Sequence, residues 1–539
     1  MGTSLGLEGQ RFVYAKNYVR LAKGKKCWSF VVFAGAQVAL LRYIYIYTQV
    51  SDHLFLRTHT SPSFMDAIVM YPSPAIGHLI SMVELAKLIL NHRPSLSIHI
   101  IVFDPPYDAG STAPYINKVY ATIPSIIFHH LPTITLLPSI ISSCQIPETL
   151  TFEVLLLNNP NLHQALVSIS NNYTIFAFIA DFFCYAAQSV TAKFNFPTYE
   201  FFTSGAGCLS LMLCFPTIHK NTTKSFKDMD NLLHIPGVPP MPAKDMPQPF
   251  LERDDNVYQY FLDATIQLPR SAGIIVNTFE SLEPRAVKAM TDGLGAPDGP
   301  LPPLPPLYCI GPLIASDNRG GSSHGGGGGD SDSKPEYLAW LDTQPIQSVV
   351  FLCFGSLGRF SAEQLKEIAV GLERSGQRFL WVVKNPPQLD TDLDSIFPEG
   401  FLDRTRERGF VLKSWAPQVE ILNHDSVGGF VTHCGWNSVL EAVCAGVPML
   451  AWPLYAEQRC NRILLVQELK IALPMVESEN GFVSSTEVDK RVREFMNSEE
   501  GDSVRRQTKA MKNEAKAALN KGGFSCVALF KLFESWKLK

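Results

Sequence analysis

The segment from Trp415 to Gln458 constrains the fold of this chain most strongly, because strand and helix patterns alternate within it. Residues Val427–Thr432 are small, apolar or β-branched, which is typical of a buried strand. A turn follows, and helical spacing runs from Val439 to Cys444 until Gly446-Val447-Pro448 ends it. Met449–Trp452 then has the pattern of a second buried strand. Such an alternation predicts a parallel α/β sheet.

The turn between this first strand and the helix has the features of an anion site. We expect Asn437 and Ser438 to form the N-cap of the helix. A helix that begins after a buried parallel strand directs its free N–H groups and the positive end of its dipole toward the carboxyl edge of the sheet. His433, Asn437 and Ser438 add side-chain donors at the same place. The turn therefore predicts a diphosphate site.

Other side chains in the segment extend this prediction to a nucleotide sugar. Glu441 lies one turn into the helix, where a carboxylate can accept hydrogen bonds from two ribose hydroxyls. Trp415 offers a flat ring for a planar base, and Glu457 and Gln458 follow a strand end where they can bind sugar hydroxyls. Taken alone, a Trp near a turn is more often a core residue, and a Glu such as Glu441 is more often a solvated helix residue. The prediction therefore depends on the whole set in this order.

These residues resemble the signature box of the plant family 1 UDP-glycosyltransferases and match it over its full length. The resemblance implies a UDP-sugar as co-substrate and no cofactor. It implies uracil stacking by Trp415, nucleoside contacts by the Ala416 backbone and Gln418, ribose binding by Glu441, phosphate binding by His433, Asn437 and Ser438, and sugar binding by Trp436, Glu457 and Gln458. The donor-binding residues that we expect in total are Thr203, Ser356, Trp415, Ala416, Gln418, His433, Gly435, Trp436, Asn437, Ser438, Glu441, Glu457 and Gln458.

A second strand–loop–helix pattern near residue 70 carries a candidate base. Ala67–Tyr71 is a short apolar strand, His78 ends the following loop, and Leu79–Leu90 has helical spacing. An imidazole with a pKa of about 6.5 can take a proton from a hydroxyl near neutral pH. A helix-capping or core histidine is the alternative. Family members carry Gly-His at this loop, with the His as general base, so the resemblance implies this role for His78.

The partner of this base is expected at the end of another strand. Ile175–Ile179 is apolar, and Asp181 lies at its carboxyl end, where a carboxylate can accept from a histidine N–H and stabilise the imidazolium. The alternative is that Asp181 only caps the next helix. The resemblance implies that His78 and Asp181 form the catalytic pair, that Thr203 lies near the donor sugar, and that Ser356 faces the diphosphate.

The region 215–270 is rich in proline and contains scattered aromatic residues. We interpret it as loops and one helix that line an acceptor pocket, because aromatic walls suit flat aromatic ligands. Plain core packing is the alternative. The aromatic residues concerned are Phe215, Phe226, Phe250, Tyr258, Tyr260 and Phe261.

Composition sets the class of protein. The chain has 539 residues, of which 46% are hydrophobic and 18% charged, with a net charge of -4, so it is long enough for two domains and offers no electrostatic reason to bind nucleic acid. Its eleven cysteines are scattered without a C-x-x-C pair, which argues against a disulfide framework or a zinc site and fits a reducing compartment. We therefore expect a cytoplasmic monomer.

Residues 1–64 do not fit this pattern. Lys23, Lys25 and Lys26 precede an apolar run, Cys27–Leu41, which is shorter than the roughly 20 residues that span a bilayer. In the family, Met65 looks like a usual start, directly before the first strand. We expect residues 1–64 to be an extension outside the fold. The alternative is a weak anchor that makes the protein membrane-associated.

The resemblance implies the GT-B arrangement, an α/β fold in which two doubly wound, Rossmann-like parallel-sheet domains face each other across a cleft. The expected parts are an N-terminal acceptor-binding domain at 65–314, a flexible Gly/Ser-rich linker at 315–333, a C-terminal UDP-sugar-binding domain at 334–523, and a C-terminal helix at 524–539 that packs back on the N-terminal domain.

We expect the reaction to be an inverting, metal-independent transfer of glucose from UDP-glucose to a hydroxyl of a small plant metabolite. In the family a closing Gln, here Gln458, together with Trp436 goes with glucose. The resemblance is strongest to the branch that glucosylates flavonoids, so an anthocyanidin, chalcone or flavonol is the expected acceptor. The alternatives are another acceptor, such as a simple phenolic, terpenoid or hormone, and a non-catalytic protein that binds UDP-sugar or flavonoid.

Overall fold

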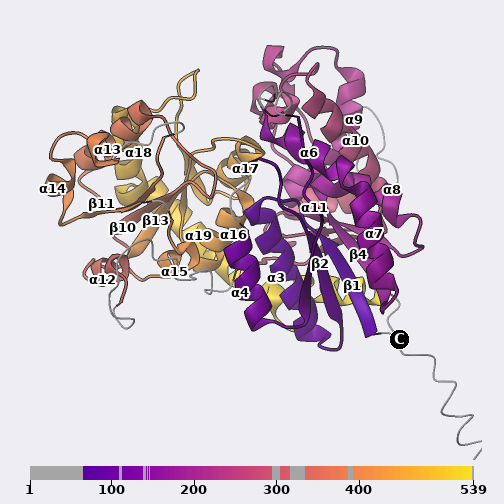
Figure 1. Cartoon of the computed structure of the whole chain (residues 1–539). Coiled ribbons are helices and arrows are strands. Elements are labelled where there is room, and N and C mark those ends of the chain that lie inside the picture. Colours follow the sequence, from indigo (N-terminus) through magenta and orange to yellow (C-terminus); the bar gives the residue numbers. More distant parts are fainter. Residues whose placement is uncertain are drawn as a thin grey trace, which may run out of the picture. The chain divides into compact units, whose positions relative to one another are not determined.

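The strands of this chain are short and mostly apolar, because helices cover both faces of a parallel sheet and bury the side chains on each face. In β1 (Met65–Tyr71) the last five residues are buried, and in β10 (Val349–Cys353) all five are. A computed structural model describes residues 65–107, 112–137, 141, 144, 146–293, 304–315, 334–386, 393–413 and 415–536. Within the unit that begins at Met65, the described strands form two large parallel sheets and one small hairpin (Figure 1).

The first sheet joins strands from the first 310 residues, with β1 near its centre. Among the described residues its order is β3 (Ile126–His130), β2 (Ser97–Val102), β1, β4 (Tyr173–Asp181), β5 (Thr198–Phe202), β8 (Gly273–Val276) and β9 (Leu307–Cys309). All of these strands pair in parallel, and β1 lies between β2 and β4. The carboxyl ends of β1 and β4 therefore lie side by side. The hairpin pairs β6 (Leu232–Leu233) with β7 (Met241–Pro242).

The second sheet uses strands from the later half of the chain. Its described order is β12 (Gly409–Lys413), β11 (Arg378–Val383), β10, β13 (Val427–Thr432), β14 (Met449–Ala451) and β15 (Ala472–Pro474), again all parallel. The strand order changes direction at β10, which lies between β11 and β13. Ligands of open α/β sheets bind at the carboxyl ends of strands at such a point.

Helices connect these strands. In the first half they are α3 (Ile76–His92), α4 (Ala113–Thr122), α6 (Pro147–Leu157), α7 (Asn159–Ser170), η1 (Phe182–Ala187), α8 (Gln188–Thr191), α9 (Ala206–Asn221), η2 (Phe226–Asp228), η3 (Ala243–Asp245), η4 (Gln248–Phe250), α10 (Asn256–Gln267), η5 (Leu268–Arg270) and α11 (Pro284–Thr291). In the second half they are α12 (Glu336–Asp342), α13 (Ala362–Ser375), η6 (Leu393–Ser395), α14 (Phe401–Thr405), α15 (Gln418–Leu422), α16 (Trp436–Ala445), α17 (Gln458–Ile463), η7 (Leu464–Glu468), α18 (Ser485–Asn497), α19 (Glu499–Leu519) and α20 (Phe524–Ser535).

Two helix starts differ from the prediction. Helix α3 begins at Ile76, so His78 lies in its first turn and not in the preceding loop. Helix α16 begins at Trp436 with Gly435 as its N-cap, so the predicted N-cap role of Asn437 and Ser438 is wrong. Gly435 is the last extended residue before α16, so both side chains lie inside its first turn, where Asn437 bonds to Gly77 in the first turn of α3 and Ser438 bonds to Gln418.

The last helix, α20, packs against the first sheet. Leu532 of α20 and Trp536, which directly follows the helix, belong to one apolar cluster with Ile68 of β1. The Ser535 hydroxyl lies 2.8 Å from the Tyr199 hydroxyl of β5, and the Ser525 hydroxyl donates to the Gly311 carbonyl. The end of the chain is therefore part of the core around β1.

Most of the aromatic residues between 215 and 270 are core residues. Phe215, Phe226, Phe250 and Tyr258 are almost fully buried, and the rings of Phe215 and Phe250 meet edge to face with centroids 4.3 Å apart. For these four the packing interpretation holds. Phe261 is also buried in this core, beside Phe183, whereas Tyr260 is only half-buried.

Some predictions fall on residues outside the described ones. These are the extension at 1–64 and nearly all of the linker at 315–333. The domain boundaries at 314, 334 and 523 stay predictions. Within the described ranges, every helix is too short or too polar to cross a bilayer.

Candidate active site

The structure brings His78 and Asp181 together, although 103 residues separate them. His78 lies in the first turn of α3 and Asp181 ends β4, at the neighbouring carboxyl ends of β1 and β4. The distance from Nδ1 of His78 to Oδ2 of Asp181 is 2.7 Å. The other carboxylate oxygen accepts from the Phe183 N–H at 3.1 Å, so Asp181 also caps η1. Asp181 therefore both caps the next helix and pairs with His78, through different oxygens of one carboxylate.

This pairing fixes the protonation chemistry of His78. A carboxylate only accepts, so Nδ1 carries the proton and Nε2 is left as the atom that can take one. Burial lowers the pKa of His78, but the charge and hydrogen bond of Asp181 outweigh it, with smaller contributions from Glu457 and Glu148, so the pKa is raised. The ring is a quarter exposed, whereas Asp181 is fully buried. Thr203 lies beside the pair, with its hydroxyl 3.3 Å from Nδ1.

The predicted nucleoside-binding residues converge on one short network between α15 and α16. The side-chain amide of Gln418 donates to the Ser438 hydroxyl at 2.9 Å and to the Glu441 carboxylate at 2.6 Å. Glu441 is 2% exposed, so it is not a solvated helix residue. Trp415 is 53% exposed, so it is not a core residue, and Ala416 beside it is buried. An exposed indole three residues before Gln418, which holds the Glu441 carboxylate, suits a planar base with an attached ribose.

His433 lies in the short turn between β13 and the start of α16. It is 6% exposed, and its Nδ1 has no hydrogen-bond partner among the described residues. Burial, and then the charge of Lys384, lowers its pKa to about 4, so the ring is neutral near pH 7. Gly355 and Gly435 pack against it, because a Cβ at either position would lie 2.5 Å from Nε2. The missing side chains let the loop after β10 approach the start of α16.

The two residues predicted to bind the sugar have defined local partners. The Glu457 carboxylate accepts from the Ser204 hydroxyl at 3.0 Å and from the Asn461 amide at 3.2 Å. The Gln458 side-chain oxygen accepts from the N–H groups of Leu454 and Tyr455, so Gln458 is 2% exposed and organises its own loop. The Gln458 side chain also hydrogen-bonds the Tyr455 hydroxyl, so its predicted contact with the sugar stays a prediction.

Trp436 has a different place from the one expected of a side chain that touches sugar. It is 3% exposed, and its indole N–H donates to the Asn277 carbonyl of the first half at 2.7 Å. The atom of Trp436 that can contact a ligand is therefore its backbone N–H, which lies in the first turn of α16. The indole instead fastens this helix start to the segment after β8.

Contacts between the two halves of the chain connect the His78 turn with α16. The Asn437 amide donates to the Gly77 carbonyl at 3.3 Å, and the Ser81 hydroxyl donates to Asn437 Oδ1 at 3.1 Å. The candidate base and the predicted phosphate-binding helix are therefore neighbours. Sequence reasoning missed Ser81, whose signal was its position one turn after Gly77 in α3.

Sequence reasoning also missed Lys384 and Glu283. Lys384 directly follows β11, which was a signal of its own because charged residues at strand ends face the ligand edge of a sheet. Glu283 is 1% exposed and accepts from the N–H groups of Ala206 and Gly207 at 2.8 Å each, so it caps α9. Within the described residues, no group of three or more His, Cys, Asp or Glu side chains is placed to hold a metal ion.

Comparisons with known proteins define the class. The family model "UDP-glucoronosyl and UDP-glucosyl transferase" matches residues 332–506. The chain is 51% identical over 475 residues to UDP-glycosyltransferase 88B1 of Stevia rebaudiana, which covers 88% of this chain and 99% of the relative. It is 48% identical to the anthocyanidin 5,3-O-glucosyltransferase of a Rosa hybrid cultivar, with the same coverage.

A solved structure agrees. Phytolacca americana UGT2 in complex with UDP-2fluoro-glucose and pterostilbene is 36% identical, with a TM-score of 0.76, covering 88% of this chain and 100% of that one. The fold and the site thus define a nucleotide-sugar transferase with the GT-B arrangement, as predicted. More narrowly, the chain belongs to the plant UDP-glycosyltransferase family, and it is an enzyme.

Proposed function

We propose that this enzyme transfers glucose from UDP-glucose to a hydroxyl of a flavonoid, with inversion and without a metal ion. The observation that carries the proposal is the contact of Asn437 with Gly77, because it sets the turn of His78 against the start of α16. The base acts on the acceptor hydroxyl and the diphosphate site holds the leaving group, so transfer requires the two sites to be neighbours. The other contacts of the site serve the steps of this reaction.

In the proposed reaction, Nε2 of His78 takes the proton of the acceptor hydroxyl as the oxygen attacks the anomeric carbon. The bond from that carbon to the diphosphate oxygen breaks on the opposite face, and UDP leaves with the electron pair. Asp181 stabilises the imidazolium through Nδ1. This order converts the α-linked sugar of UDP-glucose into a β-glucoside.

The charge that develops on UDP would be stabilised by the free N–H groups and dipole of α16, together with His433, Asn437, Ser438 and Ser356. These donors can do the work of a divalent cation, which supports a metal-independent reaction. Trp415, with Ala416, would hold the uracil, and Gln418 and Glu441 the ribose. Glu457, Gln458 and the backbone of Trp436 would hold the sugar.

The acceptor proposal rests on aromatic surroundings and on relatives. The Phe183 ring meets the His78 ring edge to face at 5.4 Å, and Phe152 and Phe261 pack against Phe183. Flat phenolic rings suit such a wall. The Rosa relative is named for an anthocyanidin acceptor, and the Phytolacca structure holds the phenolic pterostilbene. Both names support a polyphenol acceptor here.

The test is a matrix of donors and acceptors with the full chain. UDP-glucose, UDP-galactose and UDP-glucuronate are each offered with anthocyanidins, chalcones, flavonols, simple phenolics and terpenols, with and without EDTA. We expect a glucoside of a flavonoid, a β-anomer by its proton coupling, and no effect of EDTA. Preference for another donor would refute UDP-glucose as the donor. An α-anomer would refute inversion, and turnover of non-flavonoids alone would refute a flavonoid acceptor.

A further inference from the structure

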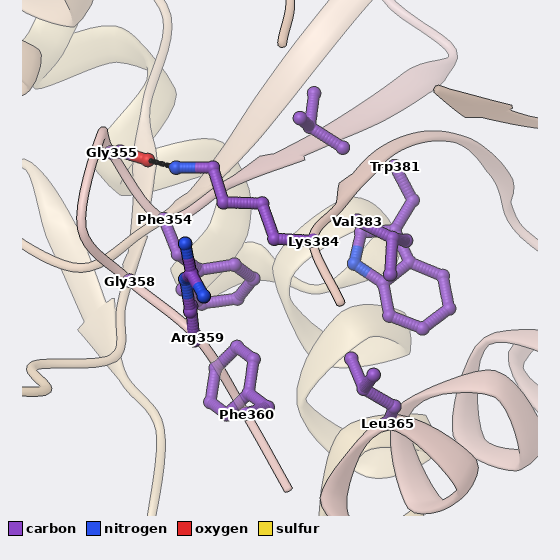
Figure 2. A pocket seen from close by; sticks show the side chains of 10 residues that line it. Phe354, Gly355, Gly358, Arg359, Phe360, Leu365, Trp381, Val383 and Lys384 are labelled. Carbon is purple, nitrogen blue, oxygen red and sulfur yellow. Dashed lines mark hydrogen bonds between the residues drawn. The ribbon is translucent and has the colours of Figure 1, made fainter. Parts of the chain in front are cut away.

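Lys384 holds a loop at the mouth of the proposed diphosphate site, and nothing in the reaction described so far uses it. It directly follows β11, whose strand lies beside β10 in parallel, so the ends of both strands are neighbours. Its ammonium donates to the Gly355 carbonyl at 2.5 Å and to the Ser356 carbonyl at 2.7 Å. Figure 2 shows the side chain of Lys384 reaching over to Gly355 across a pocket lined by Phe354, Arg359 and Trp381.

The direction of these two carbonyls decides where the loop's donors point. In a trans peptide the C=O and the N–H of one unit point in opposite directions. With the Gly355 and Ser356 carbonyls tied to Lys384, the N–H groups of Ser356 and Leu357 must face away from the ammonium. The Leu357 backbone hydrogen-bonds the Tyr455 hydroxyl, which leaves the Ser356 N–H and its exposed hydroxyl as donors on that side.

The same loop is fixed from its other side by His433. Gly355 has φ of +74°, a conformation that favours glycine, and a Cβ there would meet the His433 ring at 2.5 Å. The charge of Lys384 also reaches this ring, because it contributes to the low pKa of His433. The loop after β10 thus lies between a cation and the imidazole predicted to bind phosphate.

We propose that Lys384 is a positioning residue for the donor diphosphate. By binding two carbonyls it turns the Ser356 N–H toward the phosphates, and it removes two carbonyl dipoles that would repel an anion. Its charge adds to the positive potential at the start of α16. The proposal rests on the diphosphate site of the proposed function and extends it to a residue that does not itself have to touch the ligand.

The test compares ligands that differ only in phosphates. Binding of UDP, UMP and uridine to the full chain is measured by calorimetry for the wild type, for Lys384→Met and for Lys384→Arg. We expect Lys384→Met to weaken UDP binding about tenfold or more, because one charged group with two hydrogen bonds is lost. Uridine binding is expected to stay within about twofold. Lys384→Arg, which keeps charge and donors, is expected to recover most of the loss.

Lys366 provides the matched control, because it is an exposed lysine on α13 of the same half. Lys366→Met is expected to bind all three ligands like the wild type. Equal binding of UDP by Lys384→Met and the wild type would overturn the proposal, and so would a parallel loss of uridine, which indicates general disruption. If Lys384→Met does not fold, Lys384→Gln is judged by the same UDP-to-uridine ratio. Absence of UDP binding in the wild type would refute the proposed function itself.

Discussion

At the scale of single residues, the proposed reaction depends on the balance of two effects on the pKa of His78. Burial alone would hold its pKa below 6.5, and Asp181 raises it above that value. A general base acts only when it is neutral, so the rate of the wild type is expected to rise with pH through a pKa above 6.5. In the proposed reaction, Asp181 therefore sets both the orientation of the ring and the pH range of the rate.

Replacing Asp181 separates these effects. In Asp181→Asn, burial acts without the carboxylate charge, so the acidic limb of kcat/KM against pH is expected to move to lower pH. The rate above that limb is expected to fall by about 10²- to 10⁴-fold, because the imidazolium loses its partner. UDP affinity serves as the folding control, and it should not change. A limb that stays in place would contradict the role of Asp181.

At the scale of elements, the loop after β10 and the start of α16 fit together because two glycines leave room for His433. Gly355→Ala would place a Cβ 2.5 Å from Nε2 of His433 at a φ of +74°. We expect UDP binding to weaken by about tenfold or more, since either the loop or the ring must move. Titration with UDP measures this.

Gly376 is the matched control for this substitution. It has φ of +67° in the same half, but a Cβ there meets nothing within 4 Å. Gly376→Ala carries the backbone strain without the clash, so its cost is expected in stability, about 1 kcal/mol, and not in UDP affinity. Equal UDP affinities for the two variants would show that the contact with His433 does not matter.

The sequence predicted the elements of this fold better than their contacts. Buried strands such as β13 and β10 are evident from their apolar runs, and the end of α16 follows from Gly446, which has φ of +76°. Helices α3 and α16 begin earlier than predicted, at Ile76 and Trp436, and the Asn437 side chain bonds to Gly77, 360 residues away. Local patterns carry no information on such partners. The contact partners of Ser81, Ser204 and Lys384 were hidden for the same reason.

At the scale of the whole molecule, the last helix, α20, packs into the same core as the first described strand, β1. Leu532 of α20 is fully buried in the cluster that contains Ile68 of β1, whereas Phe530 two residues earlier is 46% exposed. Leu532→Ala is expected to destabilise the protein by about 2–5 kcal/mol, because it leaves a cavity in this core. Phe530→Ala should cost less than about 1 kcal/mol. Denaturant unfolding measures both, and similar losses would contradict this account of α20.

We propose above all that this enzyme forms a glucoside with His78 as its base. The most direct measurement incubates the full chain and its His78→Ala variant with UDP-glucose and the flavonoid panel, and detects the product by mass. We expect a product 162 Da heavier than the acceptor, the increment of one hexosyl group, and a loss of about 10²- to 10⁴-fold in rate for His78→Ala with UDP affinity unchanged. Equal rates for the two proteins would remove His78 as the base. Bound UDP-glucose without product from any acceptor would contradict the proposed transfer.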